Sequence, residues 1–493
     1  MSLNPFKSFL DVKRREVPFV ALMFGYFLLV ISVFWILKPI KKALFLAHYR
    51  GGEMFSLFGW QLGGPEAEQL AKVANMVVAF AATVVFSLLA RRLRRQQLTL
   101  VFSGFSLLSL LSFFLILRGG AEFGVWSFYL FGDLFNTLMV PTFFAFLNDS
   151  VAPADSKRLY GPIVLGGVVG GAFGSLVVAV NYQAMSNDAW LAICSVLVVL
   201  IAVMAVAAGR MVGRVMAPVD TPAAAEPPVK SVNPAIEGAR LVMRSRYLLA
   251  IFTIVALYEI ISTVADYQFT STINALVPVA GASKEANDAA VGQHLSTVFL
   301  ITNTVGLIVQ LFLTPTIMAR LSVRAALLIM PVAILGNSGL FLLLPVLWIG
   351  SLLNTTDNGL HYSINQSARE SLYTPTSRDE KYKAKAFIDM FVQRAGKAVA
   401  VGLNLALFAF FGDFSGVRWL SLFVIALVVV WLFAASYAGR RFRELTGEAG
   451  PPAAPSRSGR RRRKSGQEQA VTTSGAWPKP ARFAGLAEGH SVS

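Results

Sequence analysis

The sequence has very few of the residues that metal centres and disulfides require. Its 493 residues include one cysteine, Cys194, which excludes a disulfide framework and a cysteine-based metal site. Four histidines occur, and they form no HExxH or comparable metal-binding cluster. No GxxxxGK[ST] phosphate-binding loop is present, so ATP hydrolysis is not indicated. We therefore expect no cofactor, no metal and no enzymatic activity.

Charged residues are also scarce. They make up 14% of the chain, against roughly 25% in an average soluble protein. Hydrophobic residues make up 55%, and the mean hydropathy is +0.60. This much apolar surface cannot be hidden in a water-soluble core, so lipid is the expected solvent. The apolar segments are long and uninterrupted, which favours an all-α membrane protein over a barrel of short alternating strands.

About twelve segments have the roughly 20-residue length that a bilayer needs. The pattern predicts two six-helix halves, 1–212 and 247–440, separated by a Pro/Ala-rich linker with an amphipathic helix (213–246) and followed by a basic tail (441–493). This layout is typical of major-facilitator transporters, whose substrate lies between the halves. The predicted spans cover 18–37 (continuing to 46), 70–90, 98–117, 125–147, 160–180, 189–208, 247–269, 291–313, 325–344, 346–368, 386–411 and 417–438.

The two halves share an internal repeat. Residues 157–170 match residues 383–396 without a gap, and the next position is Gly171 in the first half and Lys397 in the second. The glycines that follow 160 lie in a span of bilayer length, where small residues allow close helix packing. We expect the repeat to provide the scaffold, and the change to Lys397 to mark substrate recognition.

The formal net charge of +17 is concentrated in loops and in the tail. Seven basic clusters fall on one side when the spans are counted, so both termini and the linker are predicted to be cytoplasmic. The basic run 460–464 is interpreted as facing lipid headgroups rather than nucleic acid. The predicted location is a bacterial inner membrane.

Ionisable residues inside the predicted spans carry the functional prediction. Each costs at least about 2.5–3.5 kcal/mol to insert near the bilayer centre, so each needs a reason to be there. Snorkelling explains one lysine near a helix end, but poorly explains three within five residues. The carboxylates are candidates for gating ion pairs with lysines of the other half, for a coupling proton or for static pairs. The residues are Lys38, Lys41 and Lys42, and Asp133, Asp266 and Asp389.

The excess of positive charge predicts a polyanionic substrate. Arg394 and Lys397 add two cations in the span that follows the basic loop around Lys385. Phosphates accept lysine as a point charge and arginine as a bidentate fork.

Several stretches resemble the nucleotide transporter family, the ATP/ADP antiporters of plastids and intracellular bacteria. Residue Asn148 with residues 157–160 is similar to that family's Asn…Ala-Lys-Arg-Phe-Tyr stretch. Residues 371–375, 383–389 and 396–397 are similar to its Ser-Leu-Phe-Asp-Pro, Lys-Gly-Lys-Ala-Ala-Ile-Asp and Gly-Lys stretches.

The resemblance implies NTP/NDP exchange or proton-driven nucleotide uptake, and it implies roles for single residues. Lys41 matches the functional lysine of span one, where Pro39 and Lys42 replace aspartates and so change the local ion pairing. Asp266 matches a functional glutamate of span seven, and Asp133 lies nearest to that of span four. The predicted substrate-binding set is Lys38, Lys41, Asp133, Asp266, Lys385, Asp389, Arg394 and Lys397.

Two alternatives remain open at this point. The first is a transporter of another organic anion or a proton-coupled solute on the same architecture. The second is a membrane scaffold or sensor that does not transport and whose basic tail binds a partner.

Overall fold

The protein is almost entirely helical in a computed structural model that describes residues 12–50, 54–57, 59–151, 153–215, 234–320, 322–377, 380–412 and 414–447. The first-half helices are α2 (Val17–His48), α3 (Gly64–Arg92), α4 (Arg95–Ile116), α5 (Glu122–Ser150), α6 (Pro153–Asn181) and α7 (Asn187–Val215). The amphipathic helix α8 (Pro234–Arg244) follows, as predicted. The second-half helices are α9 (Arg246–Leu276), α10 (Lys284–Ile308), α11 (Thr314–Arg320), α12 (Val323–Leu343), α13 (Leu347–Leu360), α14 (Gln366–Ser371), α15 (Lys385–Phe387), α16 (Gln393–Phe411) and α17 (Leu420–Thr446).

Short irregular turns join or interrupt these helices. The 3-10 turns are η1 (Leu117–Gly119) and η6 (Phe414–Trp419), and the π-helical turns are η2 (Val309–Leu313), η3 (His361–Asn365), η4 (Glu380–Ala384) and η5 (Ile388–Val392). A two-stranded antiparallel hairpin, β1 (Phe55–Leu57) and β2 (Trp60–Leu62), lies in the segment predicted to be a polar loop. The tail beyond 447 and most of the linker lie outside the described residues.

Eleven helices in the described part of the chain are long and apolar enough to cross a membrane. The predicted span 346–368 is the exception, because α13 has only 14 residues before the π-turn η3. The helical path nevertheless continues through η3 and α14 to Ser371, which is long enough to cross. Buried polar residues, including Asn354 and Asp357, lower its hydropathy.

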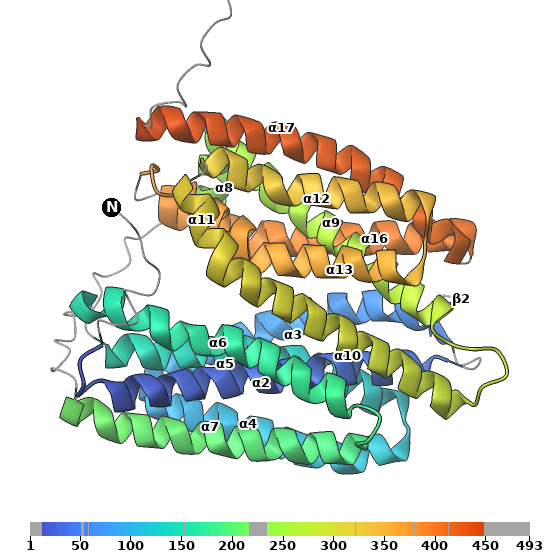
Figure 1. Cartoon of the computed structure of the whole chain (residues 1–493), viewed down its shortest axis with the longest axis horizontal. Coiled ribbons are helices and arrows are strands. Elements are labelled where there is room, and N and C mark those ends of the chain that lie inside the picture. The colour runs from blue at the N-terminus through green and yellow to red at the C-terminus, as the bar shows by residue number, and fades with distance from the viewer. Residues whose placement is uncertain are drawn as a thin grey trace, which may run out of the picture. The chain divides into compact units, whose positions relative to one another are not determined.

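The largest hydrophobic clusters lie on either side of the predicted linker. One joins residues of α2 and α4–α7, and another joins residues of α9, α12, α13, α16 and α17. Figure 1 shows these helices as two groups, blue to green and yellow to red. The groups meet where α10 packs on α2 and α6 and where α3 packs on α16 and α9.

The glycines of α6 pack against α2, as the sequence predicts. A Cβ on Gly174 would lie 2.6 Å from the carbonyl oxygen of Ser32, and the Ser32 hydroxyl donates a hydrogen bond to the Gly170 carbonyl at 3.1 Å. Backbones this close leave no space for side chains, so these glycines pack helices together.

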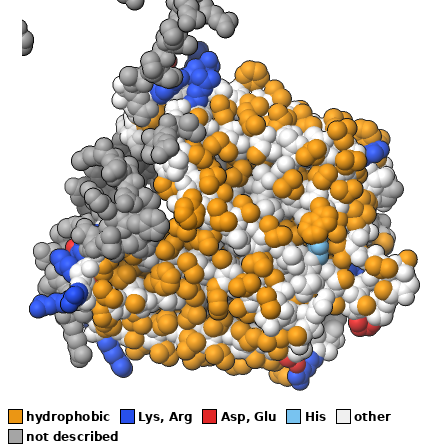
Figure 2. Space-filling view, in the orientation of Figure 1, with side chains coloured by type: hydrophobic (Ala, Val, Ile, Leu, Met, Phe, Trp, Pro, Cys, Tyr) orange, Lys and Arg blue, Asp and Glu red, His pale blue; other side chains and the backbone are white. Residues whose placement is uncertain are grey.

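Hydrophobic side chains cover the described face seen in Figure 2, and charged side chains lie mainly at its left and right margins. Exposed apolar residues of this kind include Phe80, Leu108, Val203, Phe312 and Phe433. An apolar face between charged margins fits the hydrocarbon region of a bilayer.

Candidate functional site

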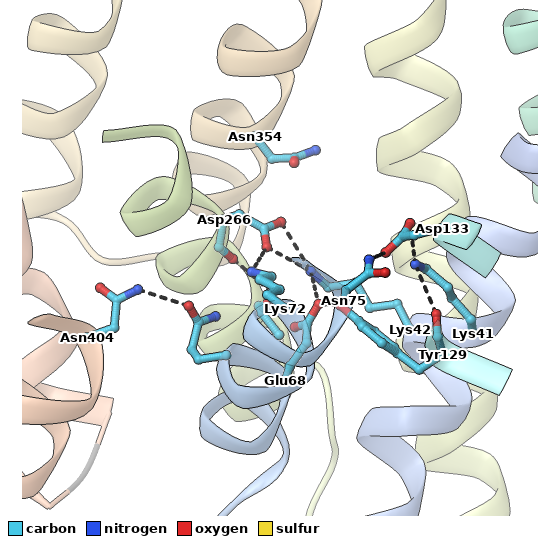
Figure 3. Close-up of polar contacts among 12 residues, drawn as sticks. Lys41, Lys42, Glu68, Lys72, Asn75, Tyr129, Asp133, Asp266, Asn354 and Asn404 are labelled. Carbon is cyan, nitrogen blue, oxygen red and sulfur yellow. Dashed lines mark hydrogen bonds and ion pairs between the residues drawn. The ribbon is translucent and has the colours of Figure 1, made fainter. Parts of the chain in front are cut away.

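Asp266 is the centre of a polar cluster that joins the two halves. Its carboxylate, on α9, forms an ion pair with Lys42 of α2 at 3.1 Å and a second ion pair with Lys72 of α3. Lys42 is also paired with Glu68 of α3 at 3.0 Å. Figure 3 shows Lys42 and Lys72 converging on Asp266 from the first half. Two lysines from one half therefore hold one carboxylate from the other.

A second set of contacts lies within the first half. The Lys41 ammonium is 2.5 Å from the Asp133 carboxylate of α5 and 4.4 Å from the ring centroid of Tyr129. Asn75 of α3 also donates a hydrogen bond to Asp133. The Tyr129 hydroxyl donates to Glu68 at 2.8 Å, which connects this set to Lys42.

These residues face one another because of their helical spacing. Glu68, Lys72 and Asn75 lie four and three residues apart on α3, so they form one polar stripe along it. Lys41 and Lys42 are successive residues, so they point in directions about 100° apart, one toward α5 and the other toward α9. Both lysines are nearly buried, at 4% and 5% exposure. Charges in such surroundings need partners, and these carboxylates supply them.

Further polar contacts cross between the halves around this cluster. The Tyr267 hydroxyl donates to Glu66 at 2.7 Å, and the Asn404 amide donates to Gln69 at 3.1 Å. Arg50, just after α2, pairs with Asp288 and donates to Asn274 at 3.3 Å. The first-half partners Glu66, Gln69 and Arg50 lie near the end of α2 and the start of α3. The polar contacts therefore join the halves at the side where the hairpin lies.

Lys38 has a different environment from its two lysine neighbours. Its ammonium lies 4.3 Å from the Trp35 ring centroid and 5.0 Å from that of Phe299, which belongs to α10 of the second half. Among the described residues no carboxylate lies within ion-pair distance of it. Aromatic faces stabilise a cation without neutralising it, so Lys38 keeps its charge available.

The second-half candidates are more dispersed. Lys397 lies 3.6 Å from Glu259 of α9, with half of its side chain exposed. Lys385 pairs with Glu370 at 2.6 Å, and Arg394 donates to the Met390 carbonyl of its own helical path. Asp389 forms no ion pair within the part of the chain that the structure describes.

Pairing with a lysine of the other half, one of the alternatives for the three candidate carboxylates, holds for Asp266 and not for Asp133 or Asp389. Asp266 pairs with Lys42 and Lys72 across the halves. Asp133 pairs with Lys41 of its own half, because α5 packs beside α2. Asp389 pairs with no lysine among the described residues, because Lys385 takes Glu370 instead.

Sequence reasoning also left four partners out of the predicted set: Lys42, Glu68, Lys72 and Asn75. Their signal was present as polar residues spaced by three and four. The span was predicted to begin at 70, which put Glu68 in a loop.

The family model and the curated relatives that match this chain agree with each other. A family model described as TLC ATP/ADP transporter matches residues 120–442. The chloroplastic ADP,ATP carrier protein 2 of Arabidopsis thaliana is 24% identical over 352 residues, which cover 66% of this chain and 56% of the relative. ADP,ATP carrier protein 1 of Chlamydia muridarum is 21% identical over 227 residues, 42% of this chain and 41% of the relative. The chain thus spans about half the length of the curated relatives that it matches.

Solved structures agree on the fold. A mutant of the nucleoside transporter NupG aligns with a TM-score of 0.60 and 13% identity, covering 85% of this chain and 99% of that one. The POT family transporter PepTSo aligns with a TM-score of 0.57 and 12% identity, covering 86% and 98%. These likenesses confirm the prediction of an all-α, multi-pass membrane protein with a major-facilitator-like fold. The family match over residues 120–442, which is more than half of the chain, establishes that the chain belongs to the TLC ATP/ADP transporter family.

Proposed function

We propose that this protein is a secondary transporter that moves nucleotides across a membrane by alternating access, as ATP/ADP exchange or exchange of another NTP/NDP pair. The observation that carries the proposal is the family match over residues 120–442, together with relatives that are named ADP,ATP carriers. Lys38 at the interface of the halves has no carboxylate at ion-pair distance among the described residues, which supports an anionic substrate. The relatives are carriers and transporters, which argues against an enzyme.

In this proposal Lys38 and Lys397 receive the phosphates first. Lys38 has aromatic neighbours and no carboxylate at ion-pair distance in the described chain. Lys397 is half exposed, and its ion pair with Glu259 is long, at 3.6 Å. They come from opposite halves, so one polyphosphate can draw both halves together. Lys385 precedes α16 and Arg394 lies in its first turn, and both would attract the anion electrostatically.

Asp266 acts as the gate. Its two lysine partners come from the other half, so the pairs must break when that side opens. A bound phosphate offers those lysines an alternative anion, which lowers the cost of breaking the pairs. The Lys41–Asp133 pair lies within one half, so it shapes the site and moves with it.

The proposed location is a bacterial cell membrane with the linker and both described ends on the cytoplasmic side. The basic residues Arg91, Arg92, Arg94 and Arg95 between α3 and α4, and Arg440, Arg441 and Arg443 at the end of α17, support it. In that orientation the cross-half contacts close the outer side.

Uptake of labelled ATP into proteoliposomes preloaded with ADP tests the function. Lys38→Gln and Lys397→Gln are each expected to lower exchange at least tenfold, because each removes a charge-assisted contact worth about 1.5–3 kcal/mol. Arg441→Gln, which changes an exposed arginine paired with Glu444, is the matched control and should exchange normally.

Normal exchange by both lysine variants would contradict the phosphate roles. No ATP/ADP exchange by the unmodified protein, with exchange of a sugar phosphate or an organic acid instead, would favour a transporter of another anion.

A further inference from the structure

Asp357 is a buried carboxylate that the site described above does not use. It lies on α13, in the middle of the least hydrophobic membrane segment, and it is 4% exposed. Its Oδ2 accepts a hydrogen bond from the Ser262 hydroxyl of α9 at 2.6 Å. Its Oδ1 is buried without a hydrogen-bond partner, and no cation lies within ion-pair distance among the described residues.

The contrast with the other interior carboxylates is informative. Asp266 has two lysines, Asp133 has Lys41, and Glu259 has Lys397. Glu66 also has a hydroxyl partner and no ion pair in the described chain, but neither of its oxygens is left buried without a hydrogen bond, as Oδ1 of Asp357 is. An ionised carboxylate with one hydroxyl and no cation is expensive in such surroundings, whereas the neutral acid is not. Asp357 is therefore placed to hold a proton rather than to complete a static ion pair.

The charged and titratable groups around Asp357 come from several elements. From α9, the negative charges of Glu259 and Asp266 act on it, and from α2 the positive charge of Lys38 acts on it. His361, four residues later, stacks flat on Tyr258 with ring centroids 4.1 Å apart. On the α10 side His294 contacts Ser351, more than one turn away, and on the α12 side the nearby polar contact is neutral, between Asn337 and Thr356.

Other neutral groups near Asp357 also lack a partner. The Nδ2 atom of Asn354, three residues before it on α13, is buried without a hydrogen-bond acceptor. In Figure 3 Asn354 lies above Asp266, on the second-half side of the gate. Asp357 thus lies between the gate at Asp266 and the Glu259–Lys397 pair, connected to both through the single helix α9.

We propose that Asp357 is a proton-binding site and that its protonation is coupled to transport of the anionic substrate. The coupling to transport rests on the proposed function, whereas the protonation of Asp357 does not. The ionised carboxylate attracts Lys38. When a proton converts it to the neutral acid, this longer-range attraction is lost and Lys38 binds a phosphate more favourably, so proton and substrate bind together. The carrier can then return with a second nucleotide, which is the exchange proposed above. It can also return empty after Asp357 has released its proton, which gives net symport of proton and nucleotide.

Infrared difference spectroscopy tests the protonation without any substrate. The full-length protein near neutral pH should show the carbonyl-stretch band of a protonated carboxylic acid, which disappears in Asp357→Asn. The control Asp149→Asn, an exposed carboxylate paired with Arg95, should keep the band. A band that Asp357→Asn leaves unchanged would overturn the proposal, whatever the protein transports.

Proteoliposomes test the coupling. With labelled ATP outside, an inward gradient of one pH unit should support about tenfold accumulation if one proton accompanies each substrate. Asp357→Asn should keep ATP counterflow without a gradient, because Asn resembles the protonated state, but should lose the accumulation. Accumulation by this variant equal to that of the unmodified protein would overturn the coupling, and so would accumulation driven by a sodium gradient instead.

Ser262→Ala provides a second variant in case Asp357→Asn does not fold. It keeps the carboxyl group and removes the hydroxyl that favours its charged form, so half-maximal accumulation should move to higher pH. An unchanged pH profile in Ser262→Ala would contradict the assignment. Absence of ATP counterflow in the unmodified protein would instead refute the proposed function and leave the infrared result to decide the proton site.

Discussion

Glu16 and Arg158 illustrate how one ion pair attaches the segment before α2 to the start of α6. Two guanidinium nitrogens of Arg158 donate hydrogen bonds to the Glu16 carboxylate, and one also reaches Asp155 at 2.7 Å. Because Arg158 donates these bonds, the pKa of Glu16 is lowered from its ordinary value. A matching pair, Glu237 with Lys383 at 2.9 Å, attaches α8 to the segment before α16. Each half therefore has its own attachment of this kind.

The lowered pKa of Glu16 predicts a pH-dependent contribution to stability. A carboxyl group whose pKa is lower in the folded state stabilises the fold above its unfolded pKa, near 4.5, and loses this effect as the pH falls through the folded pKa. Glu16→Gln should therefore lower the free energy of unfolding by about 1.5 kcal/mol at neutral pH, and by less below pH 4.5. Thermal unfolding in detergent from pH 7 to pH 3 measures it. A difference from the unmodified protein that stays constant over this range would refute the prediction.

At the residue scale the sequence predicted which charges lie among the helices better than it predicted their partners. The cost of burying charge singled out Lys38, Lys41, Asp133 and Asp266 from the sequence alone. Partners depend on which helices are neighbours, and one sequence does not specify that. Whether these residues bind substrate stays a prediction.

At the scale of helices, α2 and α6 pack with almost no side chains between them. We expect Gly174→Ala to destabilise the protein by about 1–3 kcal/mol, because its Cβ would press on the Ser32 backbone. Gly161→Ala on the same helix has nothing within 4 Å of the new Cβ and is the matched control. It should be neutral or stabilising by up to about 1 kcal/mol, since alanine favours helix.

Melting temperatures of the two glycine variants in one detergent check this prediction. Equal melting temperatures would mean that α2 and α6 accommodate the added methyl group at little cost. The packing explanation of the glycines would then be wrong.

Hydropathy located the membrane helices but not their ends. The predicted start of the second span, residue 70, follows the apolar run, whereas α3 begins at Gly64 and brings Glu66, Glu68 and Gln69 into the protein. Polar residues there face other helices instead of lipid, so their cost is offset by partners that hydropathy does not see. The same reason explains why α13, with Asn354 and Asp357 inside, is not among the helices that are long and apolar enough to cross by themselves, although its path crosses.

At the scale of the whole transmembrane unit, several polar contacts join the halves and together form the closure. Along α2 and α3 they are Gln69–Asn404, Glu66–Tyr267, Lys72–Asp266 and Arg50–Asp288, and between α6 and α10 they are Ser175–Asn303 and the Ala179 carbonyl with Gln293. The contacts α6–α10 and α3–α16 are equivalent, because each pairs the second helix of one half with the fifth helix of the other. A conformational change that opens this side must break these contacts together. The protein therefore switches between a closed and an open state instead of opening gradually.

Asp266→Asn is expected to shift the population toward the state that is open on this side. It leaves Lys72 without its carboxylate and Lys42 with Glu68 alone, so the closed state loses stabilisation that the open, hydrated state does not need.

Spin labels at Phe123 and Val279, exposed at the same side of opposite halves, report the separation by pulsed electron resonance. Cys194 is fully buried and is replaced by alanine in the labelled background. Longer distances in Asp266→Asn, with Asp188→Asn unchanged as the control for an exposed pair within the first half, are the expected result. If both variants give the distances of the unmodified protein, Asp266 is not the gate and the closure rests on the hydrogen bonds of Glu66 and Gln69.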